Sequence, residues 1–237
     1  MAQQTVDIGD HFHKHSNAYQ EVVSGINREL YQNVRKELEK YLHGRILDIG
    51  NGNVFNYDLN KLEEVIAVDV AFRDMKDTQK IKYFCGDARN LHMVKDNSCD
   101  YVVMQFLVHH IVEPSKKMTD NSMTQTLLEC RRVLKPGSQL IIVEMLVSPF
   151  VEFIEELLYS LNYQLLTWIK KPMIKFYSRL GILSRLSKVN LILSNDFKIS
   201  MGKWIDPFEA LFPGKVKLPR FLYPAECQFI ISEKPAH

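Results

Sequence analysis

The chain has 237 residues, of which 46% are hydrophobic and 24% are charged, and its formal net charge is +2. This length suits one α/β domain with an added element, and the composition is ordinary for a soluble globular protein. So small a net charge gives no reason to expect nucleic acid as a partner.

The cysteines and the apolar runs point to a reducing compartment. The four cysteines are scattered, without a C-x-x-C pair or the spacing of a zinc site. We therefore expect buried thiols. The N-terminal residues lack the apolar segment of a secretory signal, and no apolar run reaches the roughly 18 residues that cross a bilayer. These patterns predict a cytoplasmic protein.

Residues 1–18 form a polar arm that carries His11, His13 and His15. Alternate histidines on an extended segment would face one side, where they could hold a metal ion. No cluster of carboxylates or cysteines accompanies them, and polar N-terminal arms are commonly mobile. We predict no metal site.

An amphipathic helix is predicted over residues 19–42. Apolar residues recur there at every fourth position, with Glu and Lys on the other face. Gly44 should end this helix before the first strand.

The stretch RILDIGNGN at residues 45–53 organises the rest of the chain. It reads as the end of a buried strand with Asp48, followed at once by Gly50 and Gly52. Two glycines one residue apart let the chain reverse tightly and let backbone amides approach a ligand that a Cβ would exclude. A second apolar run ends at Asp69, 19 residues after Gly50, where a carboxylate can accept from both hydroxyls of a ribose. The pattern predicts a nucleoside site.

Two kinds of nucleoside cofactor use this layout. A dinucleotide fingerprint needs a third glycine, and the turn here reads GNGNVF, without it. Asp48 would also repel a pyrophosphate but suits the ammonium group of an amino acid. A nicotinamide oxidoreductase is therefore disfavoured.

Three further patterns follow at matching spacing. A strand at 81–85 is followed by Gly-Asp-Ala at 86–88, and a strand at 99–105 is followed by FLVHHI at 106–111. A helix at 123–134 ends in Lys-Pro-Gly, before a fifth strand at 138–144. Together with LDIGNG at 47–52 and LECRRVLKPG at 128–137, these motifs resemble those of the class I S-adenosylmethionine-dependent methyltransferases. The resemblance covers residues 19–145.

The resemblance implies S-adenosyl-L-methionine as cofactor and roles for particular residues. Asp48, Gly50 and Gly52 would hold its amino-acid part, and Asp69 with Val70 its ribose. Asp87 and Ala88 would hold adenine, although Asp87 is equally suited to cap a short helix. Gln105 follows at the end of the next strand, and Tyr19 of the N-terminal arm would fold over the cofactor. The candidates for a general base are, in order, His110, His109 and Glu144.

The expected fold is α/β. Strands that alternate with helices predict a doubly wound, mostly parallel, Rossmann-like sheet. The resemblance adds an antiparallel C-terminal hairpin, placed at about 197–205 and 226–233. We expect one domain over 1–237. It divides into an N-terminal arm and helix at 1–44, a cofactor-binding core at 45–147, a helical cap at 148–195 and the hairpin at 196–237.

The segment 148–195 is too long for one crossover helix and should form two or three helices. It is rich in large apolar residues, and Trp168 and Phe176 are the aromatic residues that we expect to face a pocket. From residue 157 to residue 195 it has no Asp or Glu, but it has six basic residues. It is interpreted as a cap whose lysines face water and whose apolar side walls an acceptor pocket. A peripheral contact with an anionic membrane surface through residues 165–190 stays open.

The sequence thus predicts an S-adenosylmethionine-dependent methyltransferase that acts on a small, largely apolar molecule by O- or C-methylation. Such transfer needs alignment of an acceptor and exclusion of water. The alternative is a protein that binds the same cofactor but catalyses another reaction, such as cyclisation, or serves as a non-catalytic partner subunit. The acceptor and the oligomeric state are not readable from the sequence.

Overall fold

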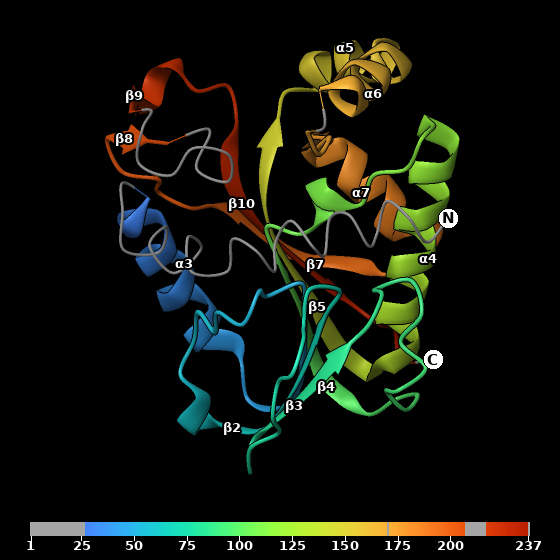
Figure 1. The fold of residues 1–237 in the computed structure, drawn as a ribbon. Coiled ribbons are helices and arrows are strands. Elements are labelled where there is room, and N and C mark those ends of the chain that lie inside the picture. Colours follow the sequence, from blue (N-terminus) through green and yellow to red (C-terminus); the bar gives the residue numbers. More distant parts are fainter. Residues whose placement is uncertain (1–26, 170, 207–216, 237) are drawn as a thin grey trace.

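The centre of the molecule is an eight-stranded sheet (Figure 1). The computed structural model describes residues 27–169, 171–206 and 217–236. Neighbouring strands follow the order β3-β2-β1-β4-β5-β10-β7, and the short β6 pairs with β5. The pairs among β1 to β6 are parallel, whereas β10 runs antiparallel to both β5 and β7. The predicted Rossmann-like sheet with an antiparallel C-terminal hairpin is confirmed.

The strands have the following bounds: β1 (Gly44–Ile49), β2 (Leu62–Asp69), β3 (Ile81–Cys85), β4 (Cys99–Gln105), β5 (Leu134–Val147), β6 (Tyr177–Ser178), β7 (Ile192–Lys198), β8 (Trp204–Ile205), β9 (Leu218–Pro219) and β10 (Glu226–Glu233). The helices are α3 (Arg28–Tyr41), α4 (Lys116–Val133), α5 (Pro149–Leu157), α6 (Tyr159–Trp168) and α7 (Arg179–Lys188). Three short 3-10 helices complete the described elements: η1 (Leu59–Lys61), η2 (Val108–His110) and η3 (Arg220–Leu222).

Helices cover both faces of the sheet because the strands are apolar on both. On one face, the four-residue spacing of α3 buries Leu30, Val34 and Leu38 in a core with Ile46 of β1. On the other face, α4 and α7 pack in a core with Leu47. Alternate side chains of β1 therefore enter opposite cores, as the geometry of a strand requires.

Three boundaries differ from the sequence-based prediction. The first strand of the hairpin is β7, which ends at residue 198, because residues 204–205 pair with 218–219 in a separate small sheet. Helix α4 begins seven residues earlier than expected, where Ser115 Oγ accepts from the N–H of Met118 and caps it. Strand β5 includes the Lys-Pro-Gly segment, since Gly137 N–H donates to the carbonyl of Lys234.

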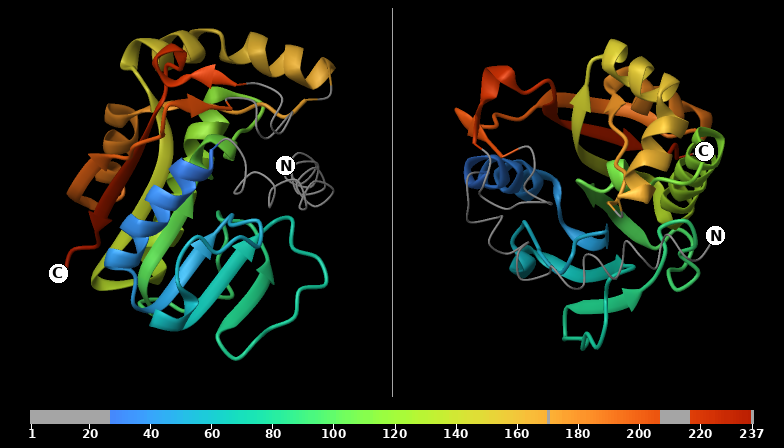
Figure 2. Two further views of the ribbon diagram at one scale, coloured as in Figure 1. Left: turned by 90° about the vertical axis from the view of Figure 1, so that its left-hand side faces the viewer. Right: turned by 45° about the horizontal axis from the view of Figure 1, so that its top comes forward.

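The described residues of the segment 148–195 form three helices. One of them packs on the sheet, and the other two lie at the end of the molecule. Helix α7 lies against α4 and the sheet, as an ordinary crossover helix does. Helices α5 and α6 instead extend across the end of the molecule toward which β5 runs (Figure 2). In the part of the chain that the structure describes, no helix combines the length and the apolar character needed to cross a bilayer.

Candidate functional site

The turn that follows β1 requires glycine at its first position. Gly50 has φ +71°, in the left-handed region, and a Cβ on it would lie 2.5 Å from the side chain of Leu107. The backbone N–H of Gly52 donates to Asp69 Oδ2 at 3.0 Å. The turn is thereby closed against the end of β2, and both glycines border a cavity.

Asp69 is the last residue of β2, and its side chain is buried. Its Oδ1 accepts from the N–H of Ala71 at 2.8 Å, while Oδ2 accepts from Gly52. Burial raises the pKa of this carboxyl group, and the two backbone donors act against that shift. A carboxylate oxygen has two lone pairs, so each can accept one further hydrogen bond from a ligand.

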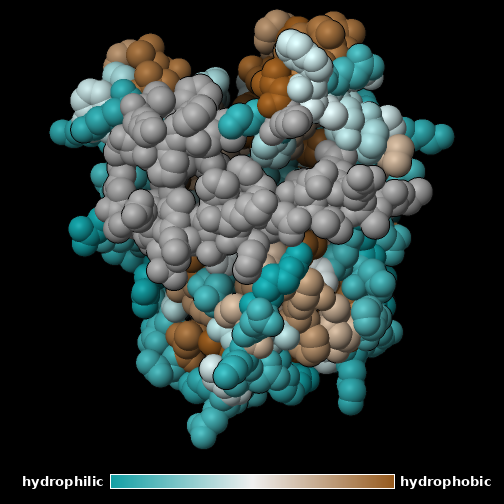
Figure 3. Space-filling view, viewed as in Figure 1, coloured by the Kyte–Doolittle hydropathy of each residue, from teal (hydrophilic) through white to brown (hydrophobic). Residues whose placement is uncertain are grey.

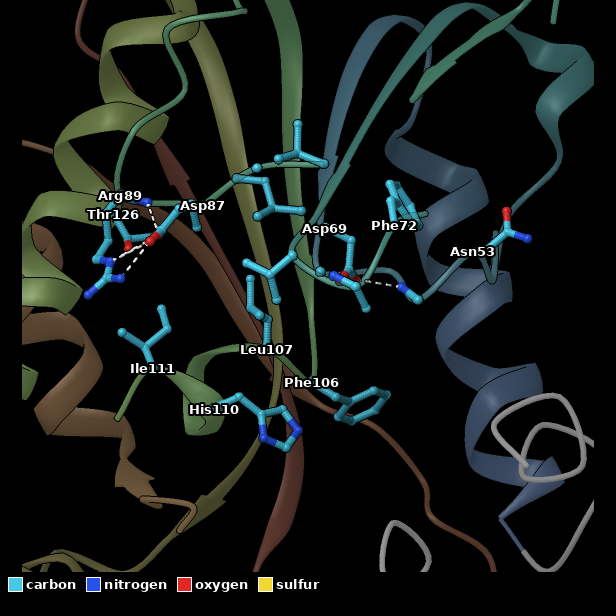
Figure 4. A pocket seen from close by; sticks show the side chains of 18 of the residues that line it. Asn53, Asp69, Phe72, Asp87, Arg89, Phe106, Leu107, His110, Ile111 and Thr126 are labelled. Atoms are coloured by element: carbon cyan, nitrogen blue, oxygen red, sulfur yellow. Dashed lines mark hydrogen bonds and ion pairs between the residues drawn. The ribbon is translucent and has the colours of Figure 1, made fainter. Parts of the chain in front are cut away.

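The cavity has a volume of about 270 Å³ and lies beyond the carboxyl ends of the parallel strands (Figure 4). Segments that follow β1, β2, β3 and β4 line it, which is where ligands bind in open α/β sheets. Seven of the residues predicted from the sequence line this cavity: Gly50, Gly52, Asp69, Val70, Asp87, Ala88 and His110.

Asp87 forms a two-point ion pair with Arg89. Asp87 Oδ1 accepts from Arg89 Nε at 2.9 Å, and Oδ2 accepts from Nη2 at 2.5 Å. Arg89 Nη1 also contacts the carboxylate of Glu113. Asp87 does not cap a helix, because residues 87–90 form a turn closed by the bond from Asn90 N–H to the Asp87 carbonyl. The guanidinium fixes the direction of the carboxylate at the edge of the cavity.

Asp48 and Gln105 lie behind the cavity and do not line it. Asp48 is fully buried, and its Oδ2 accepts from Tyr57 Oη at 2.5 Å and from Asn51 Nδ2 at 3.0 Å. Burial raises its pKa to about 6, partly offset by these two donors. Gln105 Oε1 is 3.5 Å from Asn56 Nδ2. Both residues support the turns that carry the glycines and Phe106.

The N-terminal predictions fall outside the described residues. Tyr19, proposed to cover the cofactor, and the histidines at 11, 13 and 15 belong to this part of the chain. Among residues 27–169, 171–206 and 217–236, no three His, Cys, Asp or Glu side chains gather in a metal-binding arrangement.

The two histidines of η2 occupy different positions. His110 lines the cavity next to Phe106 (Figure 4). His109 is directed to the other side, where its Nδ1 lies 2.8 Å from Glu144 Oε1, and its ring centroid is 4.0 Å from that of His110. The buried Glu144 carboxylate also accepts from the backbone N–H groups of His109 and Met145. Glu144 thus fixes the turn that presents His110.

Two aromatic residues lie beside this pair. The ring of Phe176 stacks on His109 with centroids 6.1 Å apart. Burial raises the pKa of Tyr223 to about 12, with a further contribution from the charge of Glu144. Trp168, expected to face a pocket, is 78% exposed at the end of α6, so that prediction is wrong. The residues of α5 that contact the domain are instead Glu152, Glu155 and Glu156.

Comparisons with known proteins agree with this geometry. A model of the methyltransferase domain family matches residues 47–142. No curated protein sequence matches the chain. Residues 47–142 therefore resemble the methyltransferase domain family, and the sheet that contains them has the Rossmann-like fold of class I methyltransferases.

Solved structures extend the likeness to the whole fold. One is a chain of the complex between the Haloferax volcanii Trm112 methyltransferase activator and a methyltransferase. The sequence identity is 15%, the match covers 94% of this chain and 97% of that chain, and the TM-score is 0.63. A second is the 4+2 cyclase SpnF, with 13% identity, 97% and 96% coverage and a TM-score of 0.63. A third is the Burkholderia thailandensis 1,6-didemethyltoxoflavin N1-methyltransferase with bound S-adenosylhomocysteine, with 10% identity, 97% and 88% coverage and a TM-score of 0.62. At these identities the likeness concerns the fold alone.

S-adenosylmethionine is the cofactor of the methyltransferase family whose model matches residues 47–142, and the residues present fit it. The turn at Gly50 leaves a space that a Cβ would fill, and Asp69 keeps lone pairs for two hydroxyl donors. Most of the remaining lining is apolar, which suits an adenine ring and a sulfonium-bearing chain.

Sequence reasoning assigned no role to several residues that line the cavity. Arg89 was visible only as part of the Gly-Asp-Ala-Arg segment, and its pairing with Glu113 joins positions 24 residues apart. Phe106 adopts φ +51° directly after β4, a strained conformation that no local pattern indicates. The other labelled residues of this kind in Figure 4 are Asn53, Phe72, Leu107, Ile111 and Thr126.

Proposed function

We propose that this protein transfers the methyl group of S-adenosylmethionine to a small, largely apolar molecule. The observation that carries the proposal is one cavity that joins a glycine turn, the Asp69 carboxylate and the Asp87–Arg89 pair to an apolar side with His110. The cofactor, when bound, supplies a methyl group already activated by the positive sulfur. The protein must therefore bind, align the acceptor and exclude water.

The cofactor-binding roles follow from what each residue presents to the cavity. Asp69 accepts from the two ribose hydroxyls, with Val70 beside it. The backbone at Gly50 and Gly52 allows close approach of the amino-acid part. Asp87 accepts from the exocyclic amine of adenine, and the N–H of Ala88 donates to the ring. Asp48 and Gln105 act from behind the turns, because neither lines the cavity.

His110 is the proposed general base, should the acceptor be a hydroxyl or an acidic carbon. It is the histidine that lines the cavity, and a base must lie within reach of the proton that it takes. His109 and Glu144 position it, since the hydrogen bonds from the ring and the backbone N–H of His109 to Glu144 hold the η2 turn. In this step the acceptor's proton would move to the imidazole of His110, and the acceptor would gain the methyl group as its bond to sulfur breaks and the cofactor leaves as a neutral thioether.

The character of the acceptor follows from the apolar side of the cavity. Phe106, Leu107, Ile111 and Val112 line it, with few polar groups among them. An acceptor bound there would be small and mostly apolar, with one reactive atom directed to His110.

A second candidate function is binding of the cofactor without methyl transfer. This second candidate is supported by the similarity of the fold to a cyclase and to a methyltransferase solved with an activator protein. A cyclase of this kind would retain the binding residues and leave the methyl group on sulfur.

Transfer of a labelled methyl group separates the two functions. The protein is incubated with methyl-labelled S-adenosylmethionine and a fraction of small apolar metabolites, and label in the organic phase is counted. The proposal predicts label in an extractable product with the wild type, and strong loss of it with Asp69→Ala. Tight binding of S-adenosylhomocysteine by calorimetry with no labelled product would support the non-methylating function instead. NADH is expected to show no comparable binding.

A further inference from the structure

Helix α5 turns its charged residues toward the domain. Glu152 accepts from the backbone N–H and the Oγ of Ser178, and Glu155 accepts from the N–H of Phe176. Glu156 pairs with Lys175 Nζ at 3.1 Å, although Lys175 is completely buried. Surface helices normally place charges outward and apolar side chains inward. In α5 this arrangement is reversed.

The outward face of α5 and α6 is correspondingly apolar. Its large side chains recur every three or four residues, so they form one stripe along both helices. Phe150 is 72%, Leu157 69% and Trp168 78% exposed. The other exposed apolar residues of this stripe are Phe153, Leu158, Leu161, Leu165 and Ile169.

The size of this stripe exceeds what a free monomer normally shows. An aromatic side chain offers about 150–250 Å² of surface, so Phe150, Phe153 and Trp168 alone expose roughly 300–500 Å². The leucines add to this area. The largest apolar patch of a typical monomer is about 300–600 Å² and is often functional.

A second group of exposed apolar residues lies at the same end of the molecule. It consists of Trp204, Phe221 and Leu222 on β8 and η3, of which Phe221 is 83% exposed. Figures 1 and 2 show β8 and β9 at the same end of the molecule as α5 and α6. Figure 3 shows two separate apolar protrusions, one over α5 and α6 and one over β8 and β9.

Exposed lysines lie next to both protrusions, and the partly exposed carboxylate beside η3, Glu226, is paired with Lys198 and lies 3.9 Å from Arg220. Lys171 follows the apolar stripe, Lys203 precedes Trp204, and Lys217 Nζ lies 4.8 Å from the centroid of the Trp204 ring. The carboxylates of α5 are bonded inward, and Asp206 after β8 is buried. Positive charge around an apolar surface is complementary to anionic lipid headgroups.

We propose that these two protrusions together rest on the surface of an anionic phospholipid bilayer. Tryptophan and phenylalanine side chains would enter the headgroup region, with the lysines at the phosphate level. A flat surface can cover both protrusions at once. A second copy packed on the α5–α6 stripe would leave Trp204, Phe221 and Leu222 uncovered and would bring like charges together. This inference goes beyond methyl transfer and does not depend on it.

The structure thereby corrects the membrane contact considered from the sequence. That interpretation used the basic residues of 165–190 and expected them to face water. Lys175 pairs with Glu156 inside the domain, Arg185 Nη2 bonds Asp120 at 2.6 Å, and Arg179 pairs with Asp196. The proposed contact is instead led by apolar side chains of α5, α6, β8 and η3.

Vesicle binding tests the proposal. The full chain is mixed with sucrose-loaded vesicles of about one part phosphatidylserine to two parts phosphatidylcholine and sedimented, and the partition coefficient is measured. The variant carrying Phe153→Gln, Leu161→Gln and Trp168→Gln should bind about 100-fold more weakly, as expected if each side chain inserts about half of its surface. Lys171→Gln with Lys203→Gln and Lys217→Gln should weaken binding to these vesicles and not to pure phosphatidylcholine.

The matched control is the variant with Leu128→Gln and Ile192→Gln, which changes two exposed apolar residues outside both protrusions. It should bind as the wild type does. Calorimetry with S-adenosylhomocysteine and thermal melting show that each variant is folded. Should the triple apolar variant fail to fold, the wild type still gives an answer, because both tryptophans of the chain lie on the proposed surface. Their fluorescence should be quenched by brominated lipids.

Three results would overturn the proposal. One is wild-type protein that remains in solution with anionic vesicles. Another is equal loss of binding in the Leu128→Gln, Ile192→Gln control. The third is a wild-type dimer in sedimentation velocity that the apolar variant dissociates, without tryptophan quenching by lipid, because this would make the stripe a contact between two copies.

Discussion

Replacement of Asp69 by Asn should weaken cofactor binding and also loosen the turn after β1. Both carboxylate oxygens accept backbone N–H groups, from Ala71 and Gly52. An amide has only one oxygen, so its NH₂ group must face one of these donors. An unsatisfied buried donor costs about 1–3 kcal/mol, and we expect the free energy of unfolding to fall by that amount.

The loss of affinity comes from the charge. A hydrogen bond to a charged group contributes about 1.5–3 kcal/mol, which corresponds to a roughly 10- to 150-fold larger dissociation constant. Isothermal titration with S-adenosylhomocysteine measures it, below the melting temperature of the variant. Asp96→Asn, at an exposed position away from the cavity, is the control. If Asp69→Asn binds the ligand within twofold of the wild type, Asp69 does not bind the ribose.

Three further outcomes are expected. His110→Ala should lower turnover by about 10²-fold or more and leave S-adenosylhomocysteine affinity within twofold. Glu144→Gln should also lower turnover. If both variants turn over as fast as the wild type, the η2 turn has no role in catalysis. Asp48 has a pKa of about 6 in the fold against 3.8 for the free group, so the native state binds its proton more tightly. The free energy of unfolding should therefore fall as pH rises from about 4 to about 7, by up to ~3 kcal/mol, and Asp48→Asn should abolish this part of the pH dependence in urea titrations. Gly50→Ala should lower the melting temperature and the affinity together, because a Cβ there meets Leu107 at 2.5 Å; a variant as stable as the wild type would show that the turn adapts.

The sheet could be predicted because its strands carry their own signals. The apolar runs that end at Asp48 and Asp69, and the strands 81–85 and 99–105, correspond to β1, β2, β3 and β4. The start of α4 was missed because its first turns, KKMTDNS, have little apolar periodicity and depend on the cap at Ser115. The small β8–β9 sheet joins segments 14 residues apart and could not be read from local pattern.

The site was predicted where it is built from short motifs and missed where it depends on distant contacts. The glycine turn, Asp69 and Asp87 lie in short stretches whose residue types are typical of a nucleoside site. The burial of Lys175 depends on Glu156, which is 19 residues earlier in the chain and on another element. The direction of the α5–α6 stripe was misjudged because apolar residues were assumed to face the domain, whereas the carboxylates of α5 do so.

The segment that follows α6 contacts the two-histidine element η2. The N–H of Lys175 donates to the carbonyl of His109 at 2.9 Å, and Phe176 stacks on the His109 ring. A recombinant chimera that receives the 149–176 segment from a relative would therefore receive a foreign support for η2 as well. Acceptor range and turnover would change together in such chimeras, and an exchange that preserves activity would have to include residues 106–112. Under the proposed function, divergence toward new acceptors is thus expected to proceed by paired changes in the two segments.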